Sequence, residues 1–269
     1  LHVRSRRQRQ MCIRDRFVAV PWERADLDSI VSRPFGIYLH VPFCTSRCGY
    51  CDFNTYALRT FPPGPAGDPI AHWAEQLTKE LRLGAQILTD HNITPPAANT
   101  VFFGGGTPSL LGRQLPKILD VVRECFGIAP GAEITSEANP ESTSPELFDC
   151  WRAGGVNRLS LGMQSSEPRV LALLDRQHDP ARAVAAIEEA QAAGFEHLNL
   201  DLIYGTPGET TDDVARSVDT VLATGVDHVS AYALTIEPGT ALFRKVAHGE
   251  IDPIDDDMQA DRYLSLIHI

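Results

Sequence analysis

Residues 35–51 decide the fold, and they read Phe35-Gly-Ile-Tyr-Leu-His-Val-Pro-Phe-Cys-Thr-Ser-Arg-Cys-Gly-Tyr-Cys51. The run 35–41 is rich in apolar, β-branched and aromatic residues, which predicts a buried strand. Directly after it, a loop over residues 42–57 carries Cys44, Cys48 and Cys51 in the spacing C-x3-C-x2-C. In parallel α/β proteins, the functional residues lie in the loops that follow the carboxyl ends of the strands.

The same order of strand, polar loop and helix recurs along the chain. Strands are predicted at residues 35–41, 100–103, 133–137, 158–161, 197–203 and 228–234. Helices are predicted at residues 70–88, 112–126, 145–153, 211–223 and in a stretch that ends at 193. Strands that alternate with helices of about 10–15 residues indicate a parallel sheet with right-handed crossovers.

This pattern gives six strand–loop–helix units, the last of them incomplete. A full parallel barrel has eight. We therefore predict an α/β fold in which parallel strands and outer helices form an open, partial (βα)6 barrel over residues 35–263. A doubly wound open sheet is the alternative.

Composition narrows the class of protein. The 269 residues carry a formal charge of −11, and 43% are hydrophobic, which is typical of a globular protein. The acidic balance argues against a nucleic-acid binder, and no apolar run reaches the length of about 18 residues that would predict a transmembrane helix. Three of the six cysteines cluster and three stand alone, which indicates a cytoplasmic metal site rather than a secreted disulfide framework.

The two ends of the chain are related at the level of DNA. A DNA sequence that encodes residues 11–16 has a reverse complement that encodes the residues at 264–268 and the start of the next codon. Residues 11–16 read Met-Cys-Ile-Arg-Asp-Arg, and residues 264–269 read Leu-Ser-Leu-Ile-His-Ile. We expect residues 1–16 and 264–269 to be non-native read-through of a sequencing adapter, and residues 17–34 to complete a poorly structured lead. A genuine arginine-rich arm is the alternative. We therefore do not interpret the basic start as a targeting or nucleic-acid segment.

The three clustered cysteines predict a metal centre. Thiolates this close together repel one another unless a metal neutralises them. A structural zinc site needs four ligands, and no second cysteine pair follows, since Cys125 and Cys150 fall in separate predicted helices. A [4Fe–4S] cluster held by three thiolates would leave one iron open to the amino and carboxylate groups of an amino acid. Zinc and an inert thiol group remain the alternatives.

Further polar groups follow the predicted strands. The run Gly104–Gly106 lacks side chains, so its backbone can approach a ligand closely, and its amides with Thr107 could bind one; a tight turn is the simpler interpretation. Candidate hydrogen-bonding side chains at or just beyond these strand ends are Glu137, Gln164 and Asp201, and Arg176, in the run Asp-Arg-Gln-His, could pair with a carboxylate; each could instead be a surface or capping residue. Candidate aromatic neighbours of a ligand or cluster are Tyr38, Tyr50 and Phe53.

Two histidines have a structural interpretation. His40 precedes Pro42 on the first strand, and a satisfied structural role fits it better than iron ligation. His178 and Asp179 stand where a helix begins, so a capping role is as consistent with the sequence as a role in the site.

Several separate blocks resemble one known family. The cysteine spacing is similar to the signature of radical S-adenosylmethionine (SAM) proteins. The blocks Tyr38–Asn54, Gly104–Pro108, Glu137–Pro140, Leu161–Gln164, Asn199–Pro207 and Ala233–Gly239 resemble the oxygen-independent coproporphyrinogen III oxidase family. Phe53 stands where the dehydrogenases of that family carry a fourth cysteine, and this form is similar to the heme chaperone branch, HemW.

The resemblance implies ligands and cargo. It implies a [4Fe–4S] cluster on Cys44, Cys48 and Cys51. It implies SAM contacts at Tyr38, Gly105, Gly106, Thr107, Glu137 and Ala233. It implies a possible second SAM or substrate site at Tyr50, Gln164, Arg176 and Asp201, the positions that serve a second SAM in the dehydrogenase.

For the heme chaperone branch, the implied cargo is heme and the implied partners are heme-acceptor proteins, with no nucleic acid; membrane association cannot be read from the sequence. A C-terminal domain with a heme-binding motif is typical of this branch, and the chain stops before it. The alternative functions are oxidative decarboxylation of coproporphyrinogen III and, in another class, a zinc-binding structural module.

Metal analysis of the anaerobically purified chain separates the cluster from zinc. We expect about four irons per chain, because three thiolates with this spacing suit a [4Fe–4S] cluster. A content of about one zinc with no iron would contradict this interpretation.

Overall fold

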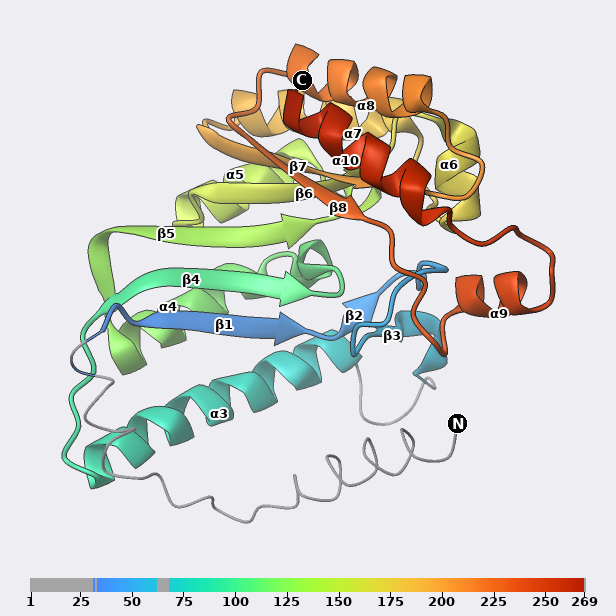
Figure 1. Cartoon of the computed structure of the whole chain (residues 1–269). Coiled ribbons are helices and arrows are strands. Elements are labelled where there is room, and N and C mark those ends of the chain that lie inside the picture. Colours follow the sequence, from blue (N-terminus) through green and yellow to red (C-terminus); the bar gives the residue numbers. More distant parts are fainter. Residues whose placement is uncertain (1–30, 32, 62–67, 269) are drawn as a thin grey trace.

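The computed structural model describes residues 31, 33–61 and 68–268. Residues 1–16, predicted to be non-native, lie outside that part, as does nearly all of the predicted lead. Six parallel strands form one sheet in the order β1-β4-β5-β6-β7-β8 (Figure 1). Their bounds are β1 Gly36–Val41, β4 Ala98–Gly105, β5 Ile128–Ala138, β6 Arg158–Gln164, β7 His197–Tyr204 and β8 His228–Ala233.

The strand order confirms the open (βα)6 arrangement. Each strand pairs in parallel with the strand before it, so the order never reverses along the sheet. A doubly wound sheet requires such a reversal, and that alternative is wrong. Because all six strands run the same way, their carboxyl ends meet at one edge, to the right in Figure 1.

Helices follow the strands and cover the sheet. Their bounds are α3 Pro69–Asp90, α4 Gln114–Phe126, α5 Pro145–Gly154, α6 Pro168–Leu173, α7 Pro180–Ala192 and α8 Thr211–Ala223. Short polar residues begin several of them: the side chains of Asp68, Ser144 and Asp179 accept hydrogen bonds from the first-turn amides, and Thr210 forms a capping box with Asp213. The capping role of Asp179 is thereby confirmed.

The structure adds elements that the sequence pattern does not predict. Two-residue strands β2 (Phe43–Cys44) and β3 (Tyr56–Ala57) bracket the cysteine loop. Helices α9 (Ala241–Ala247) and α10 (Asp256–His268) follow β8, and α10 includes residues 264–268 of the predicted tail. The stretch ending at 193 is two helices, α6 and α7, and short 3-10 turns occupy Leu58–Thr60, Pro108–Leu111 and Pro140–Ser142. Within the described residues, no helix combines the length and apolarity needed to cross a bilayer.

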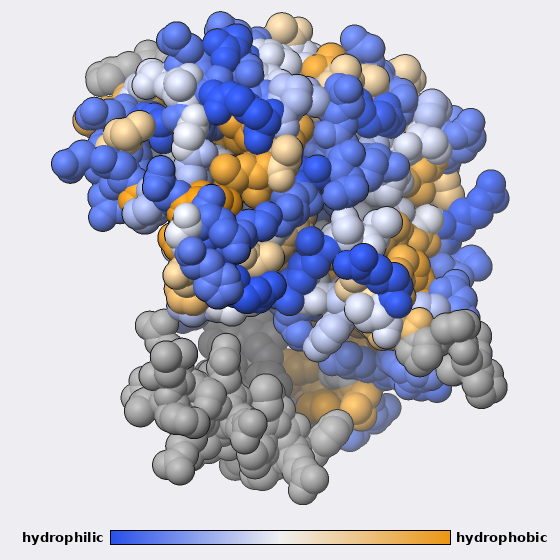
Figure 2. Space-filling model, turned by 90° about the vertical axis from the view of Figure 1, so that its right-hand side faces the viewer, coloured by the Kyte–Doolittle hydropathy of each residue, from blue (hydrophilic) through white to orange (hydrophobic). Residues whose placement is uncertain are grey.

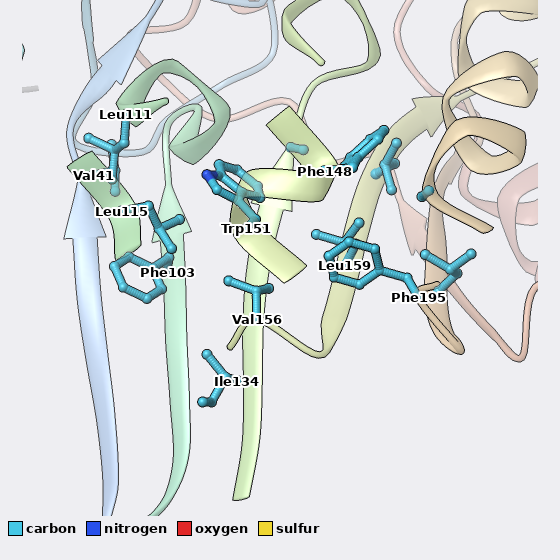
Figure 3. Close-up of a cluster of buried hydrophobic side chains, with 14 of the residues drawn as sticks. Val41, Phe103, Leu111, Leu115, Ile134, Phe148, Trp151, Val156, Leu159 and Phe195 are labelled. Atoms are coloured by element: carbon cyan, nitrogen blue, oxygen red, sulfur yellow. The ribbon is translucent and has the colours of Figure 1, made fainter. Parts of the chain in front are cut away.

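The core lies between the sheet and α3, α4, α5, α7 and α8. Trp151 and Phe148 of α5 pack over the strands with Leu159 of β6 and Phe103 of β4, all of them 0% exposed (Figure 3). The indole of Trp151 donates to the Gly112 carbonyl oxygen at 2.9 Å, so its one polar group is satisfied. This packing fixes the strands on which the site depends.

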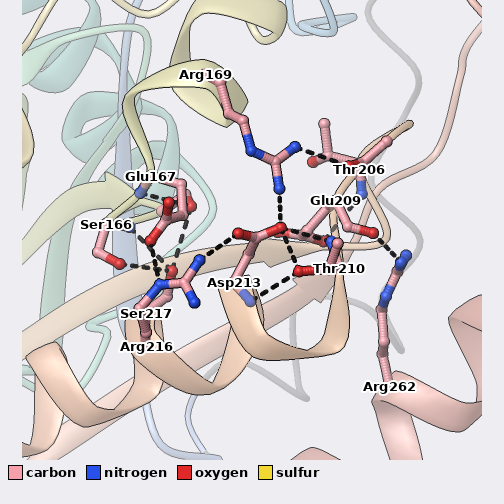
Figure 4. Close-up of polar contacts among 12 residues, drawn as sticks. Ser166, Glu167, Arg169, Thr206, Glu209, Thr210, Asp213, Arg216, Ser217 and Arg262 are labelled. Carbon is pink, nitrogen blue, oxygen red and sulfur yellow. Dashed lines mark hydrogen bonds and ion pairs between the residues drawn. The ribbon is translucent and has the colours of Figure 1, made fainter.

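A polar network joins α6, α8 and α10 (Figure 4). The buried Asp213 carboxylate accepts hydrogen bonds from the guanidinium groups of Arg169 and Arg216. The Glu209 carboxylate accepts from the Gly205 amide at 2.7 Å, and the buried Arg262 of α10 donates to the Glu209 carbonyl oxygen. The loop after β7 is therefore held from both sides.

A matched pair of leucines tests the core. Leu159→Ala removes a fully buried side chain and leaves a cavity between β6 and α5, so we expect a loss of about 2–5 kcal/mol in the free energy of unfolding. Leu222→Ala removes a leucine of α8 that is 60% exposed and should change it by about 0.5 kcal/mol or less. Urea unfolding followed by circular dichroism measures both, and equal losses would contradict the assignment of the core.

Candidate functional site

One pocket opens at the edge where the six strands end. Its volume is about 430 Å³, within the range of about 300–1,000 Å³ typical of small-molecule sites. Figure 2 looks onto the side toward which the strands point and shows apolar patches interrupting a mostly hydrophilic surface. The lining includes the cysteine loop (Cys44, Ser46, Cys48, Tyr50, Cys51, Asp52 and Phe53) and residues from the ends of β4 to β8.

The three cysteines face one volume. Cys44, Cys48 and Cys51 all line the pocket, although the short strand pair places only Cys44 in a buried position. Burial raises the pKa of the Cys44 thiol, the hydroxyls of Thr107 and Thr55 lower it, and the neighbouring Cys51 and Cys48 raise it again. The Cys51 sulfur lies 3.9 Å from the Thr55 hydroxyl oxygen. The loop thus gathers three sulfurs close enough for their charges to interact.

A glycine of the run after β4 allows this loop to pack. A Cβ atom on Gly106 would overlap the Phe43 carbonyl oxygen and lie 3.0 Å from the Cys44 sulfur. The Gly106 amide donates to the Val41 carbonyl oxygen and the Thr107 amide to that of Phe43, both at 2.7 Å. The run is therefore required for close approach of two segments of the chain.

The amides of Gly105, Gly106 and Thr107 have acceptors within the chain, and their binding of a ligand stays a prediction. The Gly106 and Thr107 amides are used within the chain, and the Gly105 amide donates to the Glu137 carboxylate at 3.0 Å. The spacing of the glycines could not show this, because the competing acceptors come from other segments. Gly105 and Gly106 therefore contribute only backbone atoms to the lining of the pocket.

Glu137 and Asp201 are two of the carboxyl groups that line the pocket. Burial raises the pKa of Glu137 to about 7, against the effect of the Gly105 amide, and the nearby Asp201 adds to the rise. Burial also raises the pKa of Asp201, whose carboxylate accepts from the Asn199 amide at 2.7 Å and from Ser160 at 3.3 Å. A cationic ligand placed between them would favour the ionised forms.

Arg176 and Gln164 supply the other strong polar groups. The Arg176 guanidinium donates to the Cys48 sulfur at 3.3 Å, to the Gly162 carbonyl oxygen at 2.8 Å and to the Asn139 side chain at 3.3 Å. Gln164 is 8% exposed with a φ of +70°, and its Oε1 atom has no partner among the described residues. This acceptor is therefore available to a ligand or to a water molecule.

Aromatic residues differ in how they stand at the pocket. Tyr50 lies against Leu174 and Leu242 beside the cysteines, and burial, with a further contribution from Cys48, raises the pKa of its phenol. Phe53 is 58% exposed and lies in the lining of the pocket, as expected of an aromatic neighbour. Tyr38 lies outside the lining, is 58% exposed and stacks on Phe102.

The structure brings together nearly all the predicted site residues. The three cysteines, Gly105, Gly106, Thr107, Glu137, Ala233, Tyr50, Gln164, Arg176 and Asp201 line one pocket; Tyr38 does not. His40 has the structural role expected of it, since its ring nitrogens contact the Tyr38 hydroxyl and the Asn54 carbonyl oxygen at 3.0 Å each.

The sequence analysis missed several lining residues, among them Asn139, Ser160, Tyr232 and Glu237. Ser160 was detectable, because residues two apart on a strand share a face, and Ser160, Gly162 and Gln164 alternate along β6.

The donor set fits a multi-iron cluster better than a single ion. Within the described ranges, no three or more histidine, cysteine or acidic side chains gather around a point where one metal ion could sit. A [4Fe–4S] cluster places each thiolate on a different iron, so its cysteines are spread around a volume rather than around a point. The three thiols, the adjoining polar pocket and the orphan Gln164 acceptor together suit a cluster with an additional ligand.

Comparison with known proteins agrees with this geometry. The family model described as the radical SAM superfamily matches residues 38–221. The chain belongs to the radical SAM superfamily. Among solved structures, the fold is similar to that of coproporphyrinogen III oxidase (HemN) from Escherichia coli, described as a radical SAM enzyme, with a TM-score of 0.77, 27% identity, and coverage of 91% of this chain and 55% of that one.

The similar curated relatives are named heme chaperone HemW. The protein from Mycobacterium tuberculosis is 55% identical over 248 residues, which cover 92% of this chain and 61% of the relative. The protein from Bacillus subtilis is 33% identical over 230 residues, which cover 84% of this chain and 57% of the relative. This radical SAM chain thus spans less than two thirds of the length of these relatives.

The raised pKa of Glu137 predicts a pH-dependent stability. The folded chain holds a proton on Glu137 up to about pH 7, whereas an unfolded glutamate loses it near pH 4.3. The contribution of this group to stability is therefore present at low pH and is lost as pH rises through that window. Glu137→Gln removes the ionisation, so the variant should gain up to about 3 kcal/mol over the parent between pH 5 and pH 8.

Urea unfolding at several pH values measures this difference. Glu133→Gln on the same strand is the matched control, because the Glu133 side chain is 53% exposed. A Glu137→Gln curve parallel to that of the parent across the range would contradict the burial of an ionisable carboxyl group.

Proposed function

We propose that this chain is the radical SAM portion of a heme chaperone, which binds a [4Fe–4S] cluster and SAM and delivers heme to acceptor proteins. The observation that carries the proposal is the 55% identity, over 92% of the chain, to a protein named heme chaperone HemW. The pocket supports it, because three thiols, four carboxyl groups and one guanidinium line it.

The cluster would be held by Cys44, Cys48 and Cys51. Gly105, Gly106, Thr107, Glu137 and Ala233 would contact SAM next to it, with Tyr38 at the margin. The sulfonium and amino groups of SAM are cationic, which suits a pocket lined by Glu137 and Asp201. Tyr50, Gln164, Arg176 and Asp201 would form a second SAM or substrate site, and the unpartnered Gln164 acceptor supports a ligand there.

When bound, the cluster supplies one electron for the reductive cleavage of SAM. The chain's own residues orient and enclose the ligands. Arg176 donates to the Cys48 sulfur and stabilises negative charge on it. Tyr50 and Leu234 form an apolar wall that limits the access of water, and Glu137 holds or releases a proton beside the ligand volume.

The second candidate is an oxygen-independent coproporphyrinogen III oxidase. The similarity in fold to the enzyme from Escherichia coli favours it. Phe53 argues against it, because this position carries a cysteine in the dehydrogenases that the sequence resembles, and Phe53 lies on the pocket rim.

We also propose that residues 35–263 form one radical SAM core, which relatives extend by further chain, and that the protein works in the cytoplasm. The cysteine usage supports a reducing compartment.

One pair of assays tests the function. The reconstituted 269-residue chain and the relative from Mycobacterium tuberculosis are incubated in parallel with heme and an apo-acceptor protein, and with coproporphyrinogen III, SAM and a reductant. We expect heme transfer by the relative, a SAM-responsive cluster signal from both proteins, and vinyl products from neither. Vinyl products from the chain would establish the oxidase instead.

Cysteine variants provide the matched control for cluster binding. Cys44→Ser, Cys48→Ser and Cys51→Ser should each lose most of the bound iron. Cys125 and Cys150 lie on helices outside the pocket, so Cys125→Ser and Cys150→Ser should retain the bound iron. Equal iron content in both groups would exclude the assigned ligands.

A further inference from the structure

Gly49 is fixed in the cysteine loop by contacts to two other segments. Its amide donates to the Leu174 carbonyl oxygen at 3.0 Å, just after α6, and its carbonyl oxygen accepts from the Leu242 amide at 2.8 Å, in the first turn of α9. Figure 1 shows α9 beside the short strands β2 and β3. Helix α9 is therefore part of the support of the cysteine loop.

The turn after α6 presses closely on this glycine. A Cβ atom on Gly49 would overlap the Oδ2 atom of Asp175 and lie 3.1 Å from its Cγ atom. Asp175 itself has a φ of +54°, a left-handed conformation that aspartate and asparagine tolerate better than other residues with a side chain. The Lys245 ammonium of α9 lies 3.2 and 3.3 Å from the two carboxylate oxygens of Asp175.

Helix α9 has an anchor of its own. Leu242 is 0% exposed and packs in a cluster with Leu174, Ile203, Leu234 and Tyr50. The Thr240 hydroxyl caps the helix by accepting from the Phe243 amide at 3.1 Å. Because α9 is anchored by Leu242 and Thr240, the ion pair between Lys245 and Asp175 restrains the turn after α6 rather than the helix.

The turn carries two consecutive contacts to the cysteine loop. Asp175 stands against Gly49, and the next residue, Arg176, donates to the sulfur of Cys48 at 3.3 Å. Among the described side chains, Arg176 alone forms a charged hydrogen bond to a sulfur of the three site cysteines. A shift of the turn would move the guanidinium away from that sulfur.

We propose that Lys245 and Asp175 are positioning residues that hold this turn against Gly49 and thereby set the Arg176 guanidinium on the Cys48 sulfur. The proposal rests on the proposed cluster at Cys44, Cys48 and Cys51. Hydrogen bonds and positive charge at the sulfurs raise the reduction potential of an iron–sulfur cluster, because they stabilise the more negative reduced state. Helix α9 thus reaches the cluster through two residues that do not touch it.

Redox titration of the anaerobically reconstituted full chain, followed by electron paramagnetic resonance, tests the proposal. Lys245→Met should shift the midpoint potential to a more negative value with the iron content unchanged. Lys245→Arg keeps the positive charge and should have the midpoint potential of the parent. Asp175→Asn should give the same negative shift, since asparagine keeps the left-handed turn and loses the charge. Lys79→Met, which breaks an exposed pair with Glu75 on α3, is the matched control and should leave the potential unchanged.

The outcomes separate this inference from the proposed function. Potentials of Lys245→Met and Asp175→Asn equal to that of the parent, with iron retained, would overturn the inference and leave the proposed function standing. A parent that takes up no iron would overturn the proposed function. In that case, hydrogen exchange of the peptide that contains Gly49 decides the positioning role: protection should fall in Lys245→Met and return in Lys245→Arg, and unchanged protection would refute it.

Discussion

The site depends on the parallel register of β1 and β4. Val41 pairs with Gly105, so the cysteine loop and the glycine run leave the sheet side by side. The hydrogen bonds from Gly106 to Val41 and from Thr107 to Phe43 continue this pairing beyond the last sheet residues. A shift of one residue would reverse the faces of every side chain on β1 and separate the two loops. The fully buried packing of Phe103 and Val41 prevents such a shift.

Acidic side chains outnumber basic ones in the lining of the pocket, and they come from different segments. Glu137 and Asp201 bring two buried carboxyl groups to the ends of β5 and β7, and Arg176 brings a guanidinium from the turn after α6. Each group has protein partners that keep its orientation, yet the pKa of both carboxyl groups is raised by burial. Buried ionisable groups with perturbed pKa values that converge in one cleft are typical of functional sites.

One residue of the pocket departs from the backbone and hydrogen-bonding preferences that most of the fold follows. Several helix starts are capped and the core side chains are closely packed, whereas Gln164 combines a left-handed backbone with an unpartnered buried oxygen. Such local conflicts are expected where function rather than stability selects the residue. Gln164 lies in the lining of the same pocket as the three cysteines.

Patterns along the chain were enough to predict the six strands, most of the helices and many of the residues that line the pocket. Hydrophobic periodicity fixes the elements locally, and parallel strands must end at one edge, so Cys44, Glu137 and Asp201 could be placed together without coordinates. Contacts between segments distant in sequence could not be predicted in this way. The engaged amides of Gly105 to Thr107, the exposed position of Tyr38 and the support of Gly49 by α9 each depend on acceptors or packing from another element. The sequence thus determined which chemical groups meet at the strand ends, and tertiary packing decided which of their atoms remain free to bind.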